Sequence, residues 1–317
     1  MSTLKESIKK FQTNYKNRLG ETEVLRIKNE SGIKQQFQIK SSKLRDDNYP
    51  TIFYHGKKTK DVIILTHGLS DSPFYMKAVG RKFYEAGLNV VFPLLPAHGL
   101  KEPDQAMEDD TLNEKWQDEM DKAVALALLF GKRISVGGFS TGGALSYNYI
   151  LRHPKNIQGG LFLFSAAIAV RLIKDASRFI SLQTITKMRD GRIFGIGRDP
   201  YKYPTFPKFG ALELGDIIRE NITLSKGKKI TQPVFAAHSV HDDSANVQGI
   251  IDLLTNYCED GLAFLISANV KHAELPLNQD ITLDMTQTRG SKVAPKANPQ
   301  FDLMMKNALT FFKEKIR

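Results

Sequence analysis

The central feature of the sequence is the stretch Ile134-Ser135-Val136-Gly137-Gly138-Phe139-Ser140-Thr141-Gly142-Gly143-Ala144-Leu145. It places Ser140 in the pattern Gly-x-Ser-x-Gly, between a β-rich run that ends near Gly138 and a helix-forming run that begins at Thr141. This spacing predicts a sharp turn from strand to helix, where larger side chains beside the serine would collide and glycine relieves the collision. The string alone is weak evidence, so the prediction depends on its position between a strand and a helix.

On both sides of this turn, apolar strands alternate with helices. Strands are predicted over 61–66, 89–92, 133–137, 160–164, 234–237 and 262–267, and helices over 73–86, 111–130, 141–152, 245–257 and about 300–315. Before them, an antiparallel entry is predicted, with strands at 21–28, 33–40 and 51–54, the last of which turns at 56–60 into the strand at 61–66. The alternation implies a mostly parallel sheet covered by helices on both faces.

The alternation stops between Ala167 and Ile230, in a basic segment that carries aromatic residues. An interruption between two strands of one sheet indicates an insertion over the sheet edge at which ligands bind. The predicted organisation therefore has three parts. These are an N-terminal helix with antiparallel strands in 1–60, an α/β core in 61–166 and 231–317, and an insertion in 167–230.

The composition is that of a globular protein, with 317 residues of which 41% are hydrophobic and 25% charged. The net charge of +11 is concentrated in two segments, with 14 basic against 6 acidic residues in 1–60 and 13 against 6 in 167–230. A polybasic coat would not divide in this way, and no zinc-finger, RNP-like or Arg-rich pattern occurs. We therefore expect no nucleic-acid binding.

Nothing in the sequence indicates secretion or a membrane span. The first 30 residues hold no apolar run of signal-peptide length, and the longest apolar stretches, Ala123–Phe130 and Gly159–Val170, are too short to cross a bilayer. Cys258 is the only cysteine, so no internal disulfide requires an oxidising compartment, and its expected role is packing. We expect a soluble, cytoplasmic protein.

Residues 3–18 form a basic amphipathic pattern, with apolar residues at helical spacing. Two interpretations stay open. The favoured one is a helix that packs on the main body, and the alternative is a weak contact with an anionic membrane surface.

A serine at such a turn becomes a nucleophile only if an imidazole takes its proton and an acid orients that imidazole. In a sheet of this topology the chain order is serine, acid, histidine. The histidines downstream of Ser140 are His238, His241 and His272. His272 follows the last predicted strand on a loop that can fold back over the sheet edge, so we predict it as the general base.

The acid must come from the loop after the strand at 234–237, where Asp242 and Asp243 stand side by side. Acids in this loop commonly lie three residues after the small residue that closes the strand, and counting from Ser239 gives Asp242. We prefer Asp242, while Asp243 stays open, and the other carboxylate would cap the next helix near Asn246 or face water.

Acyl transfer also needs two backbone N–H groups that bind the developing oxyanion. A strand runs into His67-Gly68-Leu69, where Gly68 lets the backbone turn toward the site. The predicted donors are the N–H groups of Leu69 and Thr141. His67 is expected to brace this loop through hydrogen bonds rather than to act on the substrate.

These pieces together resemble the α/β-hydrolase superfamily, and within it single-domain esterases and monoacylglycerol-lipase-like hydrolases. The resemblance covers about residues 60–317 and depends on five ordered pieces. They are His67-Gly68-Leu69, Leu95-Pro96-Ala97-His98-Gly99, Gly138-Phe139-Ser140-Thr141-Gly142, Asp242 and His272. The chain departs from the pattern at Ala97, where glycine is usual, and in the long segment 273–298 before the last helix.

The resemblance implies an α/β-hydrolase fold with Ser140 as the nucleophile, His272 as the general base and then acid, and Asp242 as the orienting carboxylate. It also implies that 167–230 forms the helical cap, inserted in the core, that selects the acyl or alcohol group. The expected activity is hydrolysis of a small-molecule acyl ester, with lipid-like esters among the candidates. Thioesterase or amidase activity on the same triad, and a non-catalytic binding role, are the alternatives. No metal or organic cofactor is expected, because the sequence holds no H-E-x-x-H pattern and no phosphate-binding loop.

Overall fold

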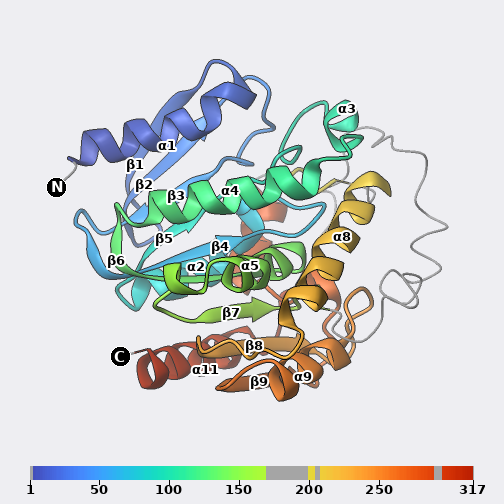
Figure 1. The fold of residues 1–317 in the computed structure, drawn as a ribbon. Helices are drawn as coiled ribbons and strands as arrows, with labels where there is room; N and C mark the ends of the chain where they lie inside the picture. Colours follow the sequence, from blue (N-terminus) through green and yellow to red (C-terminus); the bar gives the residue numbers. More distant parts are fainter. Residues whose placement is uncertain (1–2, 169–198, 204–207, 289–294, 317) are drawn as a thin grey trace.

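The computed structural model describes residues 3–168, 199–203, 208–288 and 295–316. Its centre is a nine-stranded sheet in the order β1-β2-β3-β5-β4-β6-β7-β8-β9 (Figure 1). The strands are β1 (Glu23–Glu30), β2 (Ile33–Lys40), β3 (Thr51–Tyr54), β4 (Thr59–Thr66), β5 (Asn89–Phe92), β6 (Gly131–Phe139), β7 (Leu161–Phe164), β8 (Val234–Ser239) and β9 (Gly261–Ile266). From β5 to β9 every neighbouring pair is parallel, as predicted, and the first three strands add an antiparallel edge.

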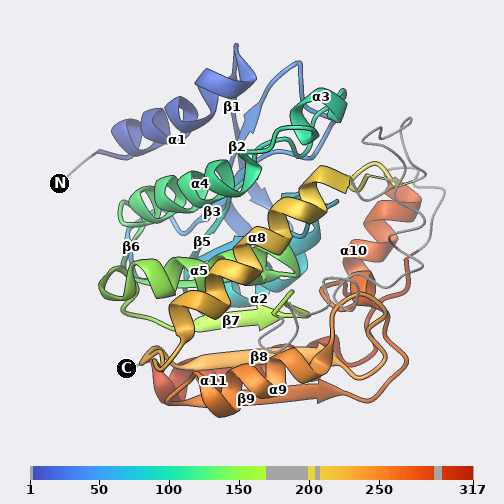
Figure 2. The same cartoon turned by 45° about the vertical axis from the view of Figure 1, so that its right-hand side comes forward.

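Helices cover both faces of this sheet. One face packs against α1 (Leu4–Leu19), α4 (Leu112–Ala127), α5 (Thr141–Arg152), α8 (Lys208–Ser225) and α9 (Val247–Asn256). The other packs against the short helix η1 (Pro73–Met76), α2 (Lys77–Glu85), α10 (Gln279–Leu283) and α11 (Phe301–Lys315). Figure 2 shows α1, α4, α5 and α8 as one layer in front of the strands.

The central strands alternate between the two cores. In β4, Val62 and Ile64 belong to one hydrophobic cluster, while Ile63 and Leu65 belong to the cluster on the opposite face. All four side chains are fully buried. A strand buried on both faces needs an unbroken apolar run, which is why the sequence of β4 is continuous rather than alternating.

One predicted pairing is wrong. The sequence suggested that the strand at 51–54 forms a hairpin with the next strand, but β3 pairs antiparallel with β5, which lies between β3 and β4. The physical reason is the burial of β4, which takes parallel neighbours, β5 and β6, on both edges. The turn at 56–60 therefore crosses over β5 instead of closing a hairpin.

The other predicted elements are present, with ends shifted by a few residues. The helix predicted over 73–86 is divided into η1 and α2, and the one predicted over 111–130 ends at Ala127. The sequence analysis missed short helices at Asp104–Met107 and at Gln279–Leu283, because each has too few residues for a periodic pattern.

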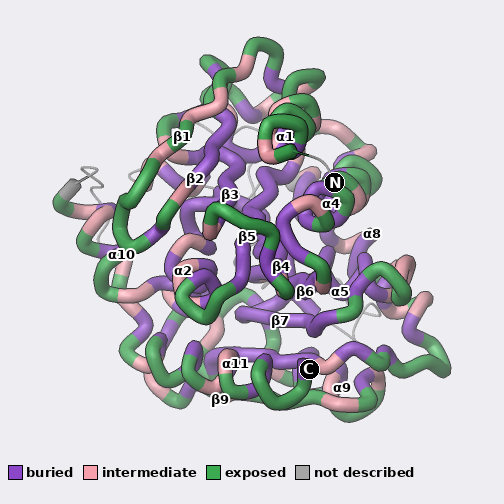
Figure 3. The backbone as a smooth tube through the Cα atoms, turned by 90° about the vertical axis from the view of Figure 1, so that its left-hand side faces the viewer, coloured by how far each residue is buried: buried purple, intermediate pink, exposed green. Residues whose placement is uncertain are grey.

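Helix α1 packs on the body of the protein. Phe11, Tyr15 and Leu19 are at most 3% exposed and lie in the same hydrophobic cluster as α4. The Tyr15 hydroxyl donates to the buried carboxylate of Glu119 at 2.7 Å, and Arg18 forms an ion pair with the same carboxylate at 3.3 Å. Figure 3 shows that the exposed residues of α1 lie on its outer side. The favoured interpretation is confirmed, and contact of this outer side with a membrane stays a prediction.

Part of the predicted cap lies outside the described residues, namely 169–198 and 204–207. Within the rest, α8 lies beside α5, as Figures 1 and 2 both show. Asn221 on α8 donates a hydrogen bond to the Ala144 carbonyl of α5 at 3.0 Å, and Asn148 donates to the Asn221 side-chain oxygen at 2.9 Å. The end of the predicted insertion is thus anchored to the helix that follows Ser140.

Candidate active site

Ser140 occupies the predicted sharp turn between β6 and α5. Its φ of 51° and ψ of −116° are rare for a residue with a side chain, and the turn is held by backbone hydrogen bonds. The Ser140 N–H donates to the Phe164 carbonyl at 3.2 Å, and its carbonyl accepts from Ala167 at 3.0 Å. Ser140 is thus fixed at the N-terminus of α5, at the carboxyl edge of the sheet.

The two glycines of the motif are required by close backbone approach. A Cβ on Gly138 would lie 2.6 Å from the carbonyl carbon of Gly142. A Cβ on Gly142 would overlap the Thr66 carbonyl and lie 2.7 Å from the His67 carbonyl oxygen. The predicted collision across the turn is thus present between Gly138 and Gly142, and the turn also packs directly against the loop that leaves β4.

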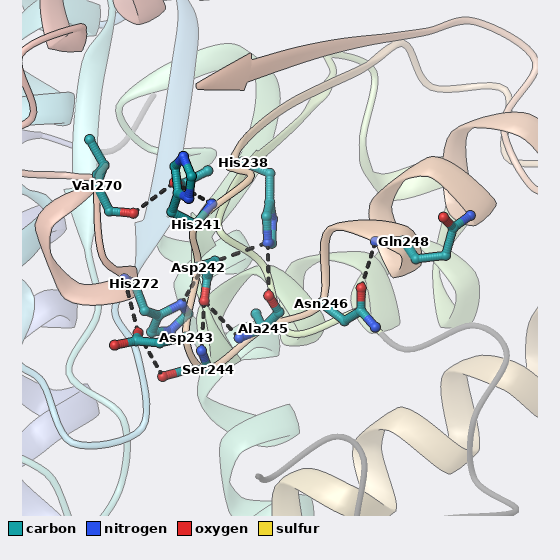
Figure 4. A network of polar contacts seen from close by, with 11 residues as sticks. His238, His241, Asp242, Asp243, Ser244, Ala245, Asn246, Gln248, Val270 and His272 are labelled. Atoms are coloured by element: carbon teal, nitrogen blue, oxygen red, sulfur yellow. Dashed lines mark hydrogen bonds and ion pairs between the residues drawn. The ribbon is translucent and has the colours of Figure 1, made fainter. Parts of the chain in front are cut away.

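His272 and Asp242 meet across the neighbouring loops (Figure 4). His272 Nδ1 lies 2.8 Å from Asp242 Oδ2, although the two residues are 30 positions apart in the chain. The Asp242 side chain is 1% exposed and that of His272 8% exposed. An Nδ1–H that donates to a carboxylate leaves Nε2 as the proton acceptor, which is the tautomer that a general base requires.

The surroundings of Asp242 favour its ionised form. Burial acts to raise its pKa, but the hydrogen bond and charge of His272, the nearby His238 and the N–H of Ala245 outweigh it and hold the pKa at about 2. Its second oxygen accepts the N–H groups of Ser244 and Ala245, each at 2.8 Å. The carboxylate is therefore both charged and fixed in orientation.

Asp243 contacts the same histidine in a different way. Its exposed carboxylate accepts the backbone N–H of His272 at 3.3 Å and makes no contact with the ring. Of the two roles suggested for the second aspartate, capping the next helix is wrong, because Asn246 caps α9 with its own side chain, and exposure to water is confirmed. Of the two candidates, only Asp242 reaches Nδ1 of His272.

The other two histidines lie near this pair. His238 is completely buried, and its Nε2 is 3.1 Å from the Ala245 carbonyl and 3.5 Å from Asp242 Oδ2. Burial lowers its pKa, so it is neutral near pH 7. His241 is exposed and faces the Ser267 carbonyl. Sequence analysis missed the contact between His238 and Asp242, although their spacing of four residues was a visible signal.

Ser239 ties the two loops of the site together, which the sequence analysis also missed. Its hydroxyl donates to the Val270 carbonyl at 2.7 Å and accepts the His241 N–H at 3.1 Å. The loop after β8 carries the acid, and the loop after β9 carries His272. The hydrogen bond from Ser239 to Val270 therefore fixes the position of the loop that carries the acid relative to the loop that carries His272.

The ring of His272 lies against the residue that precedes Ser140. Its centroid is 4.7 Å from that of the Phe139 ring. Among the described residues, none forms a hydrogen bond with Ser140 Oγ or with Nε2 of His272. Such bonds are often long in a free enzyme and tighten when the substrate binds.

The two predicted oxyanion donors lie on neighbouring segments at the same edge of the sheet. Thr66 of β4 pairs with Gly138 of β6, so the loop to Leu69 and the turn to Thr141 leave the sheet side by side. Both residues are buried, and no described residue accepts a hydrogen bond from either N–H. Unused N–H groups at this edge are available to an anionic oxygen.

Two buried histidines brace this loop. The Leu95 N–H donates to His67 Nε2 at 3.1 Å, so Nδ1 carries the proton and donates to the Gly68 carbonyl at 2.9 Å. His98 faces the carbonyls of Pro96 and Leu69 with its two ring nitrogens. Burial lowers the pKa of His67 far below its usual range and that of His98 to about 4. The structural role predicted for His67 agrees with these contacts.

Ala97, the departure from the usual motif, has a φ of 68°. This left-handed conformation costs a residue with a Cβ more than it costs glycine, which explains why glycine is usual at this position. The Ala97 carbonyl accepts from the Tyr203 hydroxyl at 3.1 Å.

Three further observations concern the described residues as a whole. No group of three or more histidine, cysteine or acidic residues able to hold a metal ion occurs among the described residues. No described helix is both long enough and apolar enough to cross a bilayer. Cys258 is buried, and burial raises the pKa of its thiol to about 12, in keeping with a packing role.

The sheet order, the two helical layers and the turn at Ser140 define the α/β-hydrolase fold, which is the fold that the resemblance found in the sequence implied. The sequence model of a family described as serine aminopeptidase, S33, matches residues 57–191. No curated protein matches the sequence.

Solved structures of esterases and lipases share this fold. One, from a study of the metagenome-derived lipolytic enzymes LipS and LipT, has 17% identity and a TM-score of 0.61 over 83% of this chain and 97% of its own. Est1E from Butyrivibrio proteoclasticus with bound ferulic acid has 16% identity and a TM-score of 0.55, covering 92% and 99%. The monoacylglycerol lipase of Paleococcus ferrophilus has 15% identity and a TM-score of 0.55, covering 81% and 95%.

Proposed function

We propose that this protein is a serine hydrolase that cleaves carboxylic esters through an acyl-enzyme on Ser140. The observation that supports this most is the pair formed by His272 and buried Asp242 at 2.8 Å, with the His272 ring against Phe139, next to a serine held at a φ of 51°. The N–H groups of Leu69 and Thr141, which no described residue accepts, support the second requirement of acyl transfer, two donors for the oxyanion. Proteins of the same fold that are described as lipolytic enzymes and as a monoacylglycerol lipase support the same class of substrate.

In the proposed first step, Nε2 of His272 takes the proton of Ser140 Oγ as the oxygen bonds to the ester carbonyl carbon. The carbonyl oxygen becomes an anion and accepts hydrogen bonds from Leu69 and Thr141. The carbon–oxygen bond to the alcohol then breaks, and His272 gives its proton to that oxygen. Water repeats the sequence on the acyl-enzyme, which releases the acid and restores the Ser140 hydroxyl.

The test is turnover of p-nitrophenyl esters, from butyrate to palmitate, together with labelling by a fluorophosphonate probe. Wild type should hydrolyse at least one ester and carry one adduct, and Ser140→Ala should lose both. Ser42→Ala replaces an exposed serine away from the site and should behave as wild type. If folded wild type neither hydrolyses an ester nor reacts with the probe, the proposal is wrong and a binding role becomes the better hypothesis.

The leaving group can be tested on the same protein. An acyl-CoA and an amino acid p-nitroanilide distinguish a thioesterase and an amidase from an oxygen-ester hydrolase. The amide arm is included because the matching family is described as serine aminopeptidases. We expect the highest kcat/KM with the oxygen ester, and a higher value with either of the others would reassign the substrate class.

A further inference from the structure

A buried carboxylate lies beside the loop that carries Leu69. Asp71 is 1% exposed, and its N–H donates to the Gly68 carbonyl at 3.2 Å, which closes a tight turn around Leu69. A Cβ on Gly68 would overlap Oδ2 of Asp71 on one side and come within 2.9 Å of the Phe139 ring on the other. The carboxylate is therefore in contact with the backbone that supplies one of the two oxyanion donors.

This carboxylate is paired with a residue from the end of the predicted insertion. Lys202 Nζ lies 3.3 Å from Asp71 Oδ1, and this is the only ion pair that Asp71 forms with a described residue. Oδ1 is buried and receives no hydrogen bond from any described donor. The charge of Asp71 is thus compensated mainly by one ammonium group.

Backbone and side-chain hydrogen bonds hold Lys202 in place. The Tyr203 N–H donates to the Ser70 carbonyl at 2.7 Å. Asn48 donates to the Pro200 carbonyl at 3.0 Å, and Arg45 to the Lys202 carbonyl at 3.2 Å. Residues 199–203 are therefore fixed to the loop that carries Leu69 and also to the segment that holds Arg45 and Asn48, which precedes β3.

Other charged groups surround this pair. Asp199 accepts hydrogen bonds from the Tyr75 hydroxyl and the Tyr201 N–H, and Lys202 Nζ lies 5.7 Å from the centre of the Tyr75 ring. Burial raises the pKa of Asp199, and the charge of Asp71 adds to that rise. The Arg45 guanidinium lies 4.4 Å from the centre of the Tyr203 ring. His98, on the other side of the loop, faces the Leu69 carbonyl and is neutral near pH 7.

A fixed negative charge beside an oxyanion hole opposes the anion that forms there, and burial strengthens this repulsion. We propose that Lys202 is a positioning residue whose ammonium neutralises Asp71, so that the N–H of Leu69 can stabilise the oxyanion of the acyl-transfer step. This inference rests on the proposed function. By this inference, residues 199–203 at the end of the insertion take part in catalysis. Lys202 acts through its charge and does not contact the substrate.

The test uses p-nitrophenyl butyrate as substrate. It compares a variant that leaves the Asp71 charge unpaired with variants that remove this charge or keep the ion pair. Lys202→Met leaves the carboxylate uncompensated, so we expect kcat to fall about 10- to 100-fold with KM changed less than about twofold. Asp71→Asn and the double variant Asp71→Asn/Lys202→Met carry no buried anion, so both should stay within about threefold of wild type. Lys202→Arg keeps the charge and should retain most of the activity. Lys101→Met, at an exposed lysine, is the matched control.

If the pair served only to fasten the loop, Asp71→Asn would lose as much activity as Lys202→Met, and the double variant would not recover. That result, or an unchanged kcat in Lys202→Met, overturns the proposal. Thermal unfolding of each variant shows whether it is folded, and the double variant keeps the test valid where Lys202→Met is unstable. Turnover and labelling of the wild type distinguish a failure of this proposal from a failure of the proposed function. If the wild type shows neither, the proposed function itself is contradicted.

Discussion

At the scale of single residues, the contacts of Asp242 show what a buried charge needs. Its oxygens receive two backbone N–H groups and the ring of His272, and a second imidazole, that of His238, lies 3.5 Å away. A buried carboxylate without such donors would take up a proton. The side chain can therefore orient His272 while remaining charged.

Replacing Asp242 by Asn should lower kcat by about 10⁴-fold, because an amide no longer fixes Nδ1–H on His272. Steady-state turnover of p-nitrophenyl butyrate measures this loss. Asp243→Asn is the matched control, since the Asp243 carboxylate accepts the backbone N–H of His272 and the Ser244 hydroxyl, and we expect less than about tenfold loss. Equal losses in the two variants would contradict the assignment of Asp242 as the acid.

Sequence analysis placed Ser140, Asp242 and His272 through the order of motifs along the chain, and the structure brings the last two into contact. The contact of His238 with Asp242 and the ion pair of Lys202 with Asp71 could not be found in this way. Asp71 and Lys202 are 131 positions apart. Their meeting depends on how the insertion returns to the core, which no local pattern encodes.

At the scale of elements, α1 is a structural part of the protein. Phe11 is fully buried and meets the Tyr15 ring edge to face at a centroid distance of 5.6 Å. Phe11→Ala should lower the free energy of unfolding by about 3–5 kcal/mol, because it leaves a cavity between α1 and the sheet. Urea unfolding measures this change.

The neighbouring exposed residue provides the control for this prediction. Lys10→Ala should change the free energy of unfolding by less than about 0.5 kcal/mol. If Phe11→Ala lowered the free energy of unfolding as little as Lys10→Ala, α1 would be only loosely attached to the body. Its basic outer side would then become the better explanation for its presence.

The elements also show where local pattern fails. Most strands were predicted within a few residues, because a buried strand needs an unbroken apolar run. The neighbour of β3 was not predicted correctly, since pairing is decided by long-range packing and the turn at 56–60 resembles that of a hairpin. Helix α8 lies inside the segment predicted to form the helical cap, but its bounds were not predicted, because strands and helices stop alternating there.

At the scale of the whole molecule, three neutral histidines are buried among the core and the loops of the site. His67, His98 and His238 are each at most 1% exposed, and burial lowers the pKa of all three. An unfolded chain binds protons on these residues below about pH 6.5, while the folded protein does not. Stability should therefore be complete above that pH and decrease as the pH falls toward the folded-state values.

For His98, with a folded pKa of about 4, the expected loss is about 2 kcal/mol between about pH 7 and about pH 5. Urea unfolding at both pH values measures it. His98→Gln should reduce the dependence on pH, whereas His241→Gln, at an exposed histidine, should leave it unchanged. A dependence that survives in His98→Gln would place its origin elsewhere in the molecule.

The left-handed backbone of Ser140 has a consequence for the balance between stability and activity. Holding a residue with a side chain at this φ destabilises the folded state by about 1–3 kcal/mol. The hydrogen bonds of Ser140 with Phe164 and Ala167 keep the backbone in this conformation. This strain is present in the folded protein before any substrate binds. The nucleophile is therefore already in place when a substrate binds, and the fold is less stable than the same chain with glycine at that position would be.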